Sequence, residues 1–139
     1  MKRMHYLAIG LAIATGIFPA QAEELPGAPA ASSIAEPQAA FAKLSGRWVR
    51  PDGGYVISIK SADADGKLDA SYANPNPLPF YAATAAEDGG TLKLFFELRA
   101  GGYNGSTYML NYDAAADRLK GTYYQAVAKQ TFEVIFVRR

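Results

Sequence analysis

TLKLFFELRAGGYNGSTYMLNY, residues 91–112, is the stretch that decides the fold of this chain. Apolar residues occupy every second position from Leu92 to Leu98, which is the period of a strand with one buried face. Asn104-Gly105 then predicts a tight hairpin turn, because both residue types accept a positive φ. The alternation resumes from Tyr108 to Tyr112. The stretch therefore predicts an antiparallel hairpin.

The same two-residue period extends to both sides of this hairpin. Eight strands are predicted in all, over residues 47–50, 55–60, 68–72, about 80–86, 92–98, 108–112, 119–123 and 132–136. Asn74–Pro79 is predicted to be a loop, because its three prolines have no N–H to donate to a ladder. The connections are too short for crossover helices, so parallel pairing is excluded. We expect an all-β, eight-stranded antiparallel up-and-down barrel that closes to remove its edges, with a two-sheet β-sandwich as the alternative.

The first 22 residues have the pattern of a secretory signal peptide. Lys2 and Arg3 precede the apolar run Leu7–Phe18, and Ala20-Gln21-Ala22 predicts cleavage after Ala22. Residues 23–35 are then expected to form a flexible leader, and residues 36–139 a single domain that opens with a short helix over about 36–43. The expected location is periplasmic or secreted.

Composition argues against most catalytic chemistry. The only histidine, His5, lies in the predicted signal peptide, and the chain has no cysteine. A serine nucleophile would therefore lack its usual base, and we expect no enzyme activity, no metal and no cofactor. The turn Asp63–Asp69 resembles a calcium loop, but Tyr72 stands where such a loop needs a bidentate glutamate.

Charge and cysteine content also limit the partners. Without Lys2 and Arg3 the chain carries 12 basic and 13 acidic residues, for a net charge of −1. A nearly neutral chain lacks the basic field that binds nucleic acid or an anionic membrane, so neither partner is expected. No cysteine follows the signal to carry a lipid, so no membrane anchor is expected either.

Gly46-Arg47-Trp48, at the start of the first predicted strand, resembles the Gly-x-Trp signature of lipocalins and related calycin barrels. In those families the tryptophan closes one barrel end, and an arginine from the last strand packs across its ring. Arg138 is the matching residue here, and such a contact gains about 0.5–2 kcal/mol. The layout also resembles avidin-type barrels and small exported bacterial proteins. The resemblance implies a barrel that carries a small apolar ligand, although the Thr-Asp-Tyr segment of lipocalins is missing.

Whether such a barrel is hollow depends on its inward side chains. Nine of the eighteen predicted inward positions are aromatic: Trp48, Tyr55, Tyr72, Phe96, Tyr108, Tyr112, Tyr123, Phe132 and Phe136. Rings of this number fill an eight-stranded interior at normal packing density, so a filled core is favoured over a ligand cavity.

Strand polarity sorts the connections into two ends. The turns 62–66, 87–90 and 114–117 are short and acidic, whereas 51–54, 74–79, 99–105 and 126–129 are richer in Pro, Gly and Asn. Loops of the second kind on a rigid barrel are suited to binding, although turn chemistry alone also explains them. The candidate ligand-binding residues are Asn74, Asn76, Arg99, Tyr103, Asn104 and Gln125.

A second candidate surface lies on the outer face of the last strands. Its apolar residues are Phe95, Met109, Tyr124, Ile135 and Val137. Such a stripe is expected to be covered, either by the segment 34–44 or by a partner, for example in a homodimer. The functional alternatives are therefore a ligand carrier, a protein-interaction or envelope-accessory module, and an inhibitor of a secreted enzyme that uses the 74–79 loop.

Overall fold

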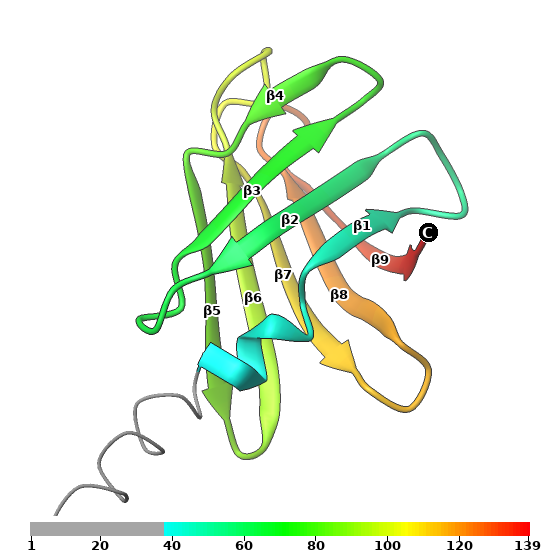
Figure 1. Cartoon of the computed structure of the whole chain (residues 1–139). Coiled ribbons are helices and arrows are strands. Elements are labelled where there is room, and N and C mark those ends of the chain that lie inside the picture. Colours follow the sequence, from blue (N-terminus) through cyan, green and yellow to red (C-terminus); the bar gives the residue numbers. More distant parts are fainter. Residues whose placement is uncertain (1–37) are drawn as a thin grey trace, which may run out of the picture.

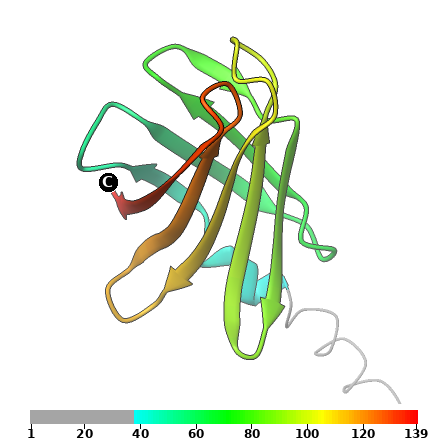
Figure 2. The ribbon, with the colours of Figure 1, turned by 180° about the vertical axis from the view of Figure 1, so that it is seen from behind.

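A computed structural model of the chain describes residues 38–139 and shows one antiparallel sheet (Figure 1). Its nine strands are β1 (Gly46–Val49), β2 (Val56–Ala62), β3 (Leu68–Ala73), β4 (Pro77–Pro79), β5 (Ala82–Asp88), β6 (Thr91–Leu98), β7 (Ser106–Asp113), β8 (Arg118–Gln125) and β9 (Gln130–Arg138). Their order across the sheet is β4-β3-β2-β1-β9-β8-β7-β6-β5. The sheet is curled into a half-barrel, and the first and last strands, β1 and β9, pair in its middle (Figure 2).

The all-β antiparallel prediction is confirmed, but the count of eight strands, the closed barrel and the alternative sandwich are wrong. All eight predicted strands are present in a single sheet, and β4 is an additional strand inside the segment predicted to be a loop. Leu78 supplies the only backbone N–H of β4, because Pro77 and Pro79 flank it. Proline is tolerated on an edge strand, and β4 is one of the two edges of the sheet.

The sheet stays open at one place, which we call the seam, between β3 and β5. β4 pairs with Ser71–Ala73 and so occupies the edge of β3 that a closed barrel would offer to β5. β5 meets the β2–β3 turn only at the far end of this edge, through the bridge Lys67–Thr84 and a 2.6 Å hydrogen bond from the Ala85 N–H to the Gly66 carbonyl. The prolines therefore divert the chain, and the barrel is left unclosed along most of the seam.

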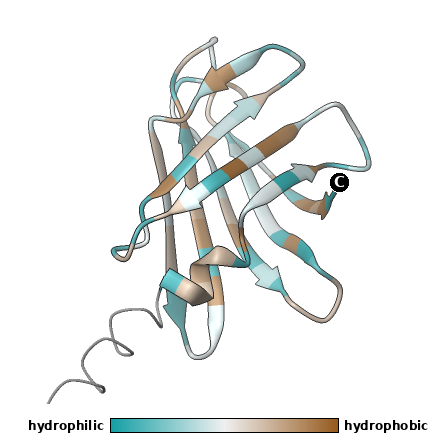
Figure 3. Cartoon of the chain, in the orientation of Figure 1, coloured by the Kyte–Doolittle hydropathy of each residue, from teal (hydrophilic) through white to brown (hydrophobic). Residues whose placement is uncertain are grey.

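The concave side of the sheet is filled by apolar side chains. Hydrophobic and hydrophilic residues alternate along the strands in Figure 3, and eighteen buried hydrophobic residues form one cluster. Among the largest fully buried side chains are Trp48, Tyr72, Phe96, Tyr108 and Phe136. Phe132, predicted to face inward, is instead 43% exposed near the start of β9, where its ring packs against Tyr123 with centroids 6.4 Å apart.

A short helix over residues 38–42 covers one end of the half-barrel, which we call the helix end. Phe41 and Leu44 are buried in the core, and the Leu44 carbonyl accepts a 2.9 Å hydrogen bond from the indole N–H of Trp48. The predicted signal peptide (1–22) and leader (23–35) lie outside the described residues. Within residues 38–139, no helix is long and apolar enough to cross a membrane.

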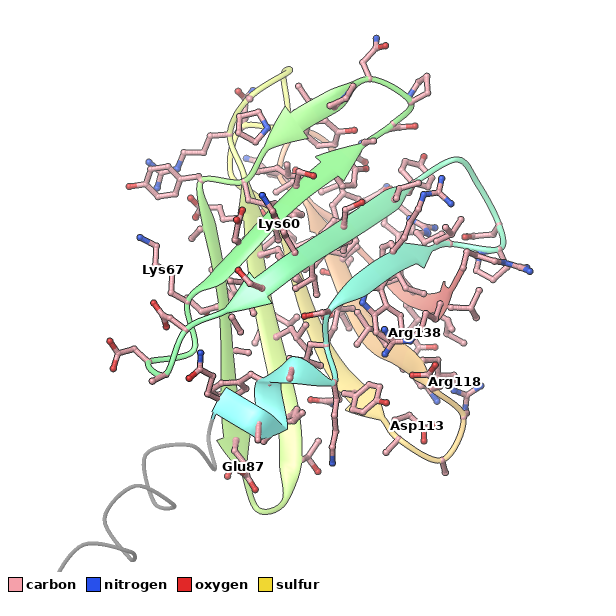
Figure 4. All side chains as sticks on the ribbon, in the orientation of Figure 1. Lys60, Lys67, Glu87, Asp113, Arg118 and Arg138 are labelled. Carbon is pink, nitrogen blue, oxygen red and sulfur yellow. The ribbon has the colours of Figure 1, made fainter. Side chains whose placement is uncertain are left out.

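Arg138 connects the last strand to this helix end (Figure 4). Its guanidinium carbon lies 4.2 Å from the centre of the Trp48 ring. The same group donates to the carbonyls of Lys43, at 2.7 Å, and Ser45, and it pairs with both carboxylate oxygens of Asp117 at 2.8 and 3.1 Å. The Arg138 guanidinium also holds the pKa of the Asp117 carboxyl below its usual value. One side chain therefore bridges the first strand, the last strand and the chain that enters the sheet.

Candidate ligand-binding site at the open end

The end of the half-barrel opposite the helix, which we call the open end, collects four loops. These loops join β1 to β2, β3 to β4, β6 to β7, and β8 to β9 (Figures 1 and 2). They surround a pocket of about 290 Å³. Its lining residues are Tyr55, Asn74, Gly101, Gly102, Tyr103, Ser106, Tyr123, Gln125 and Val127.

Three of the six residues proposed from the sequence, Asn74, Tyr103 and Gln125, line this pocket. They come from the β3–β4 loop, the β6–β7 loop and the end of β8, and it is the curl of the sheet that brings them together. The sequence could place them at one end of the sheet because consecutive antiparallel strands alternate in direction.

The other three proposed residues do not line the pocket. Arg99 lies outside it, where it pairs with Glu97 at 2.6 Å and stacks 3.3 Å from the centre of the Tyr81 ring. Asn104 has a φ of 49° and serves the loop between β6 and β7 as a turn residue. Asn76 is exposed, and its carbonyl accepts a 3.3 Å hydrogen bond from the Asn74 N–H.

A hydrogen-bonded chain runs from the pocket wall into the core. The Asn74 amide donates to the Tyr103 hydroxyl at 3.2 Å, and that hydroxyl donates to the Tyr72 hydroxyl at 3.3 Å. The rings of Tyr103 and Tyr72 also pack edge to face, with centroids 5.4 Å apart. Burial raises the pKa of Tyr72 far above its ordinary value, so this hydroxyl stays protonated and neutral while it accepts from Tyr103. The chain fixes the orientation of the two lining residues before any ligand arrives.

Ser106 holds two of the loops together. Its fully buried hydroxyl donates to the Tyr103 carbonyl at 2.6 Å and accepts from the Ala126 N–H at 3.0 Å. The β6–β7 loop and the β8–β9 loop are thereby fixed to one side chain. Nothing in the sequence singled out this residue, because a serine beside a glycine turn is ordinary turn chemistry.

A group of tyrosines lies at the inner side of the pocket. Tyr123 lines it and stacks on Tyr108 with ring centroids 4.5 Å apart. The Tyr108 hydroxyl is buried and has no hydrogen-bond partner among residues 38–139. Burial raises the pKa of Tyr108 to about 12. The sequence predicted both residues as core, and the structure places Tyr123, which is 8% exposed, at the boundary between the core and the pocket.

The pocket is electrically neutral. None of its nine lining residues carries a charge at neutral pH. The cation Arg50 lies close enough to influence the pKa of Tyr108, but Asp52 compensates it through two hydrogen bonds of 2.9 and 2.6 Å. The same pairing lowers the pKa of Asp52, and Arg50 also stacks 4.5 Å from the centre of the Tyr55 ring. Arg50 therefore supports the wall of the pocket as part of an ion pair.

The outer apolar residues do not form one unbroken stripe. Phe95 lies directly opposite Met109, but the row continues through Thr122 and Glu133. Ile135 lies opposite Lys120. The helix at residues 38–42 and the adjoining Leu44 pack at the helix end, so the described part of the segment predicted to cover this surface does not lie over it. What remains is a smaller patch centred on Phe95 and Met109, of which Met109 is 63% exposed.

Comparison with known proteins gives no indication of what this site binds. No protein-family model matches the chain, and no curated protein or solved structure matches it significantly. Residues 38–139 also hold no group of three or more His, Cys, Asp or Glu side chains placed to bind a metal ion.

Proposed function

We propose that this protein is an exported binding protein, without catalytic activity, that holds a small ligand in the pocket at the open end. The observation that carries the proposal is the pre-organised wall formed by Asn74, Tyr103 and Ser106, whose side chains are fixed by hydrogen bonds. Binding sites gain affinity when their polar groups need no ordering on contact. A pocket lined by aromatic rings and a few oriented polar groups is the usual form of a small-molecule site.

The ligand of this proposal is polar rather than apolar. Lipocalin-type carriage of an apolar molecule requires room inside the sheet, and here buried rings such as Phe96, Tyr108 and Phe136 occupy that space. The open-end pocket offers two side-chain amides and several hydroxyls instead. Several of these groups are bonded within the wall, but an apolar ligand would displace the water around the Gln125 amide and the remaining hydroxyl positions without replacing its hydrogen bonds, which carries a free-energy cost. The apolar ligand expected from the resemblance is therefore replaced by a polar one.

Thermal unfolding in the presence of a chemically diverse library of small molecules tests this function. A ligand present at about 100 times its dissociation constant adds about 2.7 kcal/mol of stability and raises the Tm by about 10–20 °C. Gln125→Ala should reduce the shift because it removes a pocket amide. Gln130→Ala is the matched control, since Gln130 faces Gln125 across the β8–β9 hairpin, is exposed, and does not line the pocket. Equal shifts in both variants would rule out this pocket as the site.

A second candidate function is association through the patch of Phe95 and Met109. This patch borders a groove of about 320 Å³ on the outer face of β5, β6 and β7. Homodimers and protein-interaction modules bury patches of this kind. Light scattering coupled to size-exclusion chromatography tests it: a dimer that Met109→Lys converts to a monomer would support association, and a wild-type monomer would exclude the homodimer.

A further inference from the structure

We infer that the ligand of the open-end pocket is a neutral saccharide, bound through one or two sugar rings. This inference rests on the proposed function and names its ligand class. Three properties of the site lead to it: its charge, the pairing of flat rings with hydrogen-bonding groups, and its depth.

The charge of the site excludes ligands that are recognised as ions. All lining side chains are uncharged, and the nearby Arg50 is already compensated by Asp52. An anion entering the pocket would lose its hydration without gaining an unpaired cation, and a cation would find no carboxylate in the lining. The site therefore favours a ligand whose hydrogen bonds are made between neutral groups.

The lining combines flat rings with groups that both donate and accept hydrogen bonds. Tyr55, Tyr103 and Tyr123 contribute rings, and Asn74 and Gln125 contribute amides. An amide offers a donor and an acceptor side by side, which matches the hydroxyls around the edge of a sugar ring. The C–H faces of the same sugar ring are apolar and suit the electron-rich face of an aromatic ring. A neutral sugar presents such an apolar face and a hydroxylated edge on one ring.

The depth of the site limits the size of the ligand. The partly buried hydroxyl pair of Tyr103 and Tyr72 and the stacked pair of Tyr123 and Tyr108 form its inner boundary. At about 290 Å³ the pocket lies at the small end of ligand sites, where one or two sugar rings fit. Because the loops leave it open to solvent, the rest of a longer glycan would extend outward. The occupant is then the end of a chain or a disaccharide.

Isothermal titration calorimetry with matched probes tests the inference. The neutral probes are maltose, cellobiose and N,N′-diacetylchitobiose, backed by an array of neutral glycans, and the charged probes are glucuronic acid and glucosamine. We expect at least one neutral saccharide to bind, and neither charged probe. The affinity should be the same at about 0.05 M and about 0.5 M NaCl, because no ion pair forms. Gln125→Ala should weaken it about five- to tenfold through the loss of a neutral hydrogen bond, and Gln130→Ala should leave it unchanged.

The possible failures are distinguishable. Binding of a charged molecule or a peptide that is weakened by Gln125→Ala, with no binding of neutral saccharides, would overturn the saccharide inference and leave the proposed function standing. Saccharide binding that Gln125→Ala and Gln130→Ala affect equally would place the site elsewhere and overturn the inference. If no probe of any class binds and neither variant alters any thermal shift, both the inference and the proposed function are wrong.

Discussion

The contact of Arg138 with Trp48 gives the sharpest test of what holds this sheet together. Arg138→Met retains much of the apolar side chain but removes the guanidinium. The variant loses the contact with the Trp48 ring, the bonds to the carbonyls of Lys43 and Ser45, and the pair with Asp117. Arg139→Met is the matched control, because the Arg139 backbone N–H, which the substitution keeps, makes its bond to Arg47.

The expected loss follows from the exposure of the groups. The Arg138 side chain is 32% exposed, so the cation–π contact contributes about 1 kcal/mol. Each bond to a backbone carbonyl contributes about 1 kcal/mol at this exposure. The pair with Asp117, whose side chain is 48% exposed, adds less than about 1 kcal/mol. The sum is about 3 kcal/mol, or about 12–20 °C in Tm for a domain of this size.

Urea unfolding followed by fluorescence is the assay, since Trp48 is the only tryptophan in the chain. We expect Arg138→Met to unfold at lower urea with an unchanged m-value, and Arg138→Lys to lose about half as much, because lysine keeps the charge but not the fork of donors. Arg139→Met should match the wild type. If Arg138→Met lowers the free energy of unfolding by less than about 1 kcal/mol, the Arg138 side chain does not stabilise the helix end as we infer.

Four further predictions concern packing and titration. Gly121→Ala should abolish folding or lower the free energy of unfolding in urea by more than about 3 kcal/mol, because a Cβ there would overlap the backbone of β7. Gly54→Ala is the control and should be nearly neutral, because its Cβ meets open space. Tyr108→Phe should leave stability unchanged or raise it by up to about 1 kcal/mol, since it removes a buried hydroxyl that has no hydrogen-bond partner among residues 38–139. A clear decrease of the Tm in this variant would show that the hydroxyl is hydrogen-bonded. The pKa of Tyr108 is raised to about 12 in the folded protein, so its contribution to stability is complete below about pH 10 and is lost as the pH rises to about 12. An ultraviolet titration in which every tyrosine of the folded protein ionises near pH 10 would contradict this prediction. In acid the stability depends on pH in the opposite direction. Because the pKa of Asp117 is lowered in the folded protein, its carboxylate contributes fully to stability above about pH 4, and this contribution is lost below that pH. Arg138→Met should remove this pH dependence from acid unfolding curves.

The strands were predictable because their signal is local. A period of two needs only the residues themselves, and all eight predicted strands are present. The ninth strand and the open seam arise because β4 and β5 compete to pair with the same edge of β3. Residues 77–79 pair with part of that edge although they have a single backbone N–H. No alternation of apolar residues predicts such a pairing. Closure of a sheet is decided by this competition between distant segments, which the sequence pattern does not record.

The candidate site was predictable only in its location. Strand direction assigns each loop to one end of the sheet, which placed Asn74, Tyr103 and Gln125 together. Which side chains turn toward one another is set by the path of each loop. Ser106 illustrates the difference, because its role arises from its distance to the β8–β9 loop, twenty residues away in the chain.

The pairing of β1 with β9 has a consequence for the order of assembly. Strands β1–β4 and β5–β9 are each built from neighbours in sequence, and within the sheet they are joined by two register pairs, Trp48 with Arg138 and Val49 with Val137, together with the bridge at the seam. Pairing between sequence neighbours can form β1–β4 and β5–β8, but neither part has a partner strand in the middle of the sheet until β9, the last of these nine strands in the chain, is in place. A chain that lacks β9 would therefore leave the sheet divided at its centre.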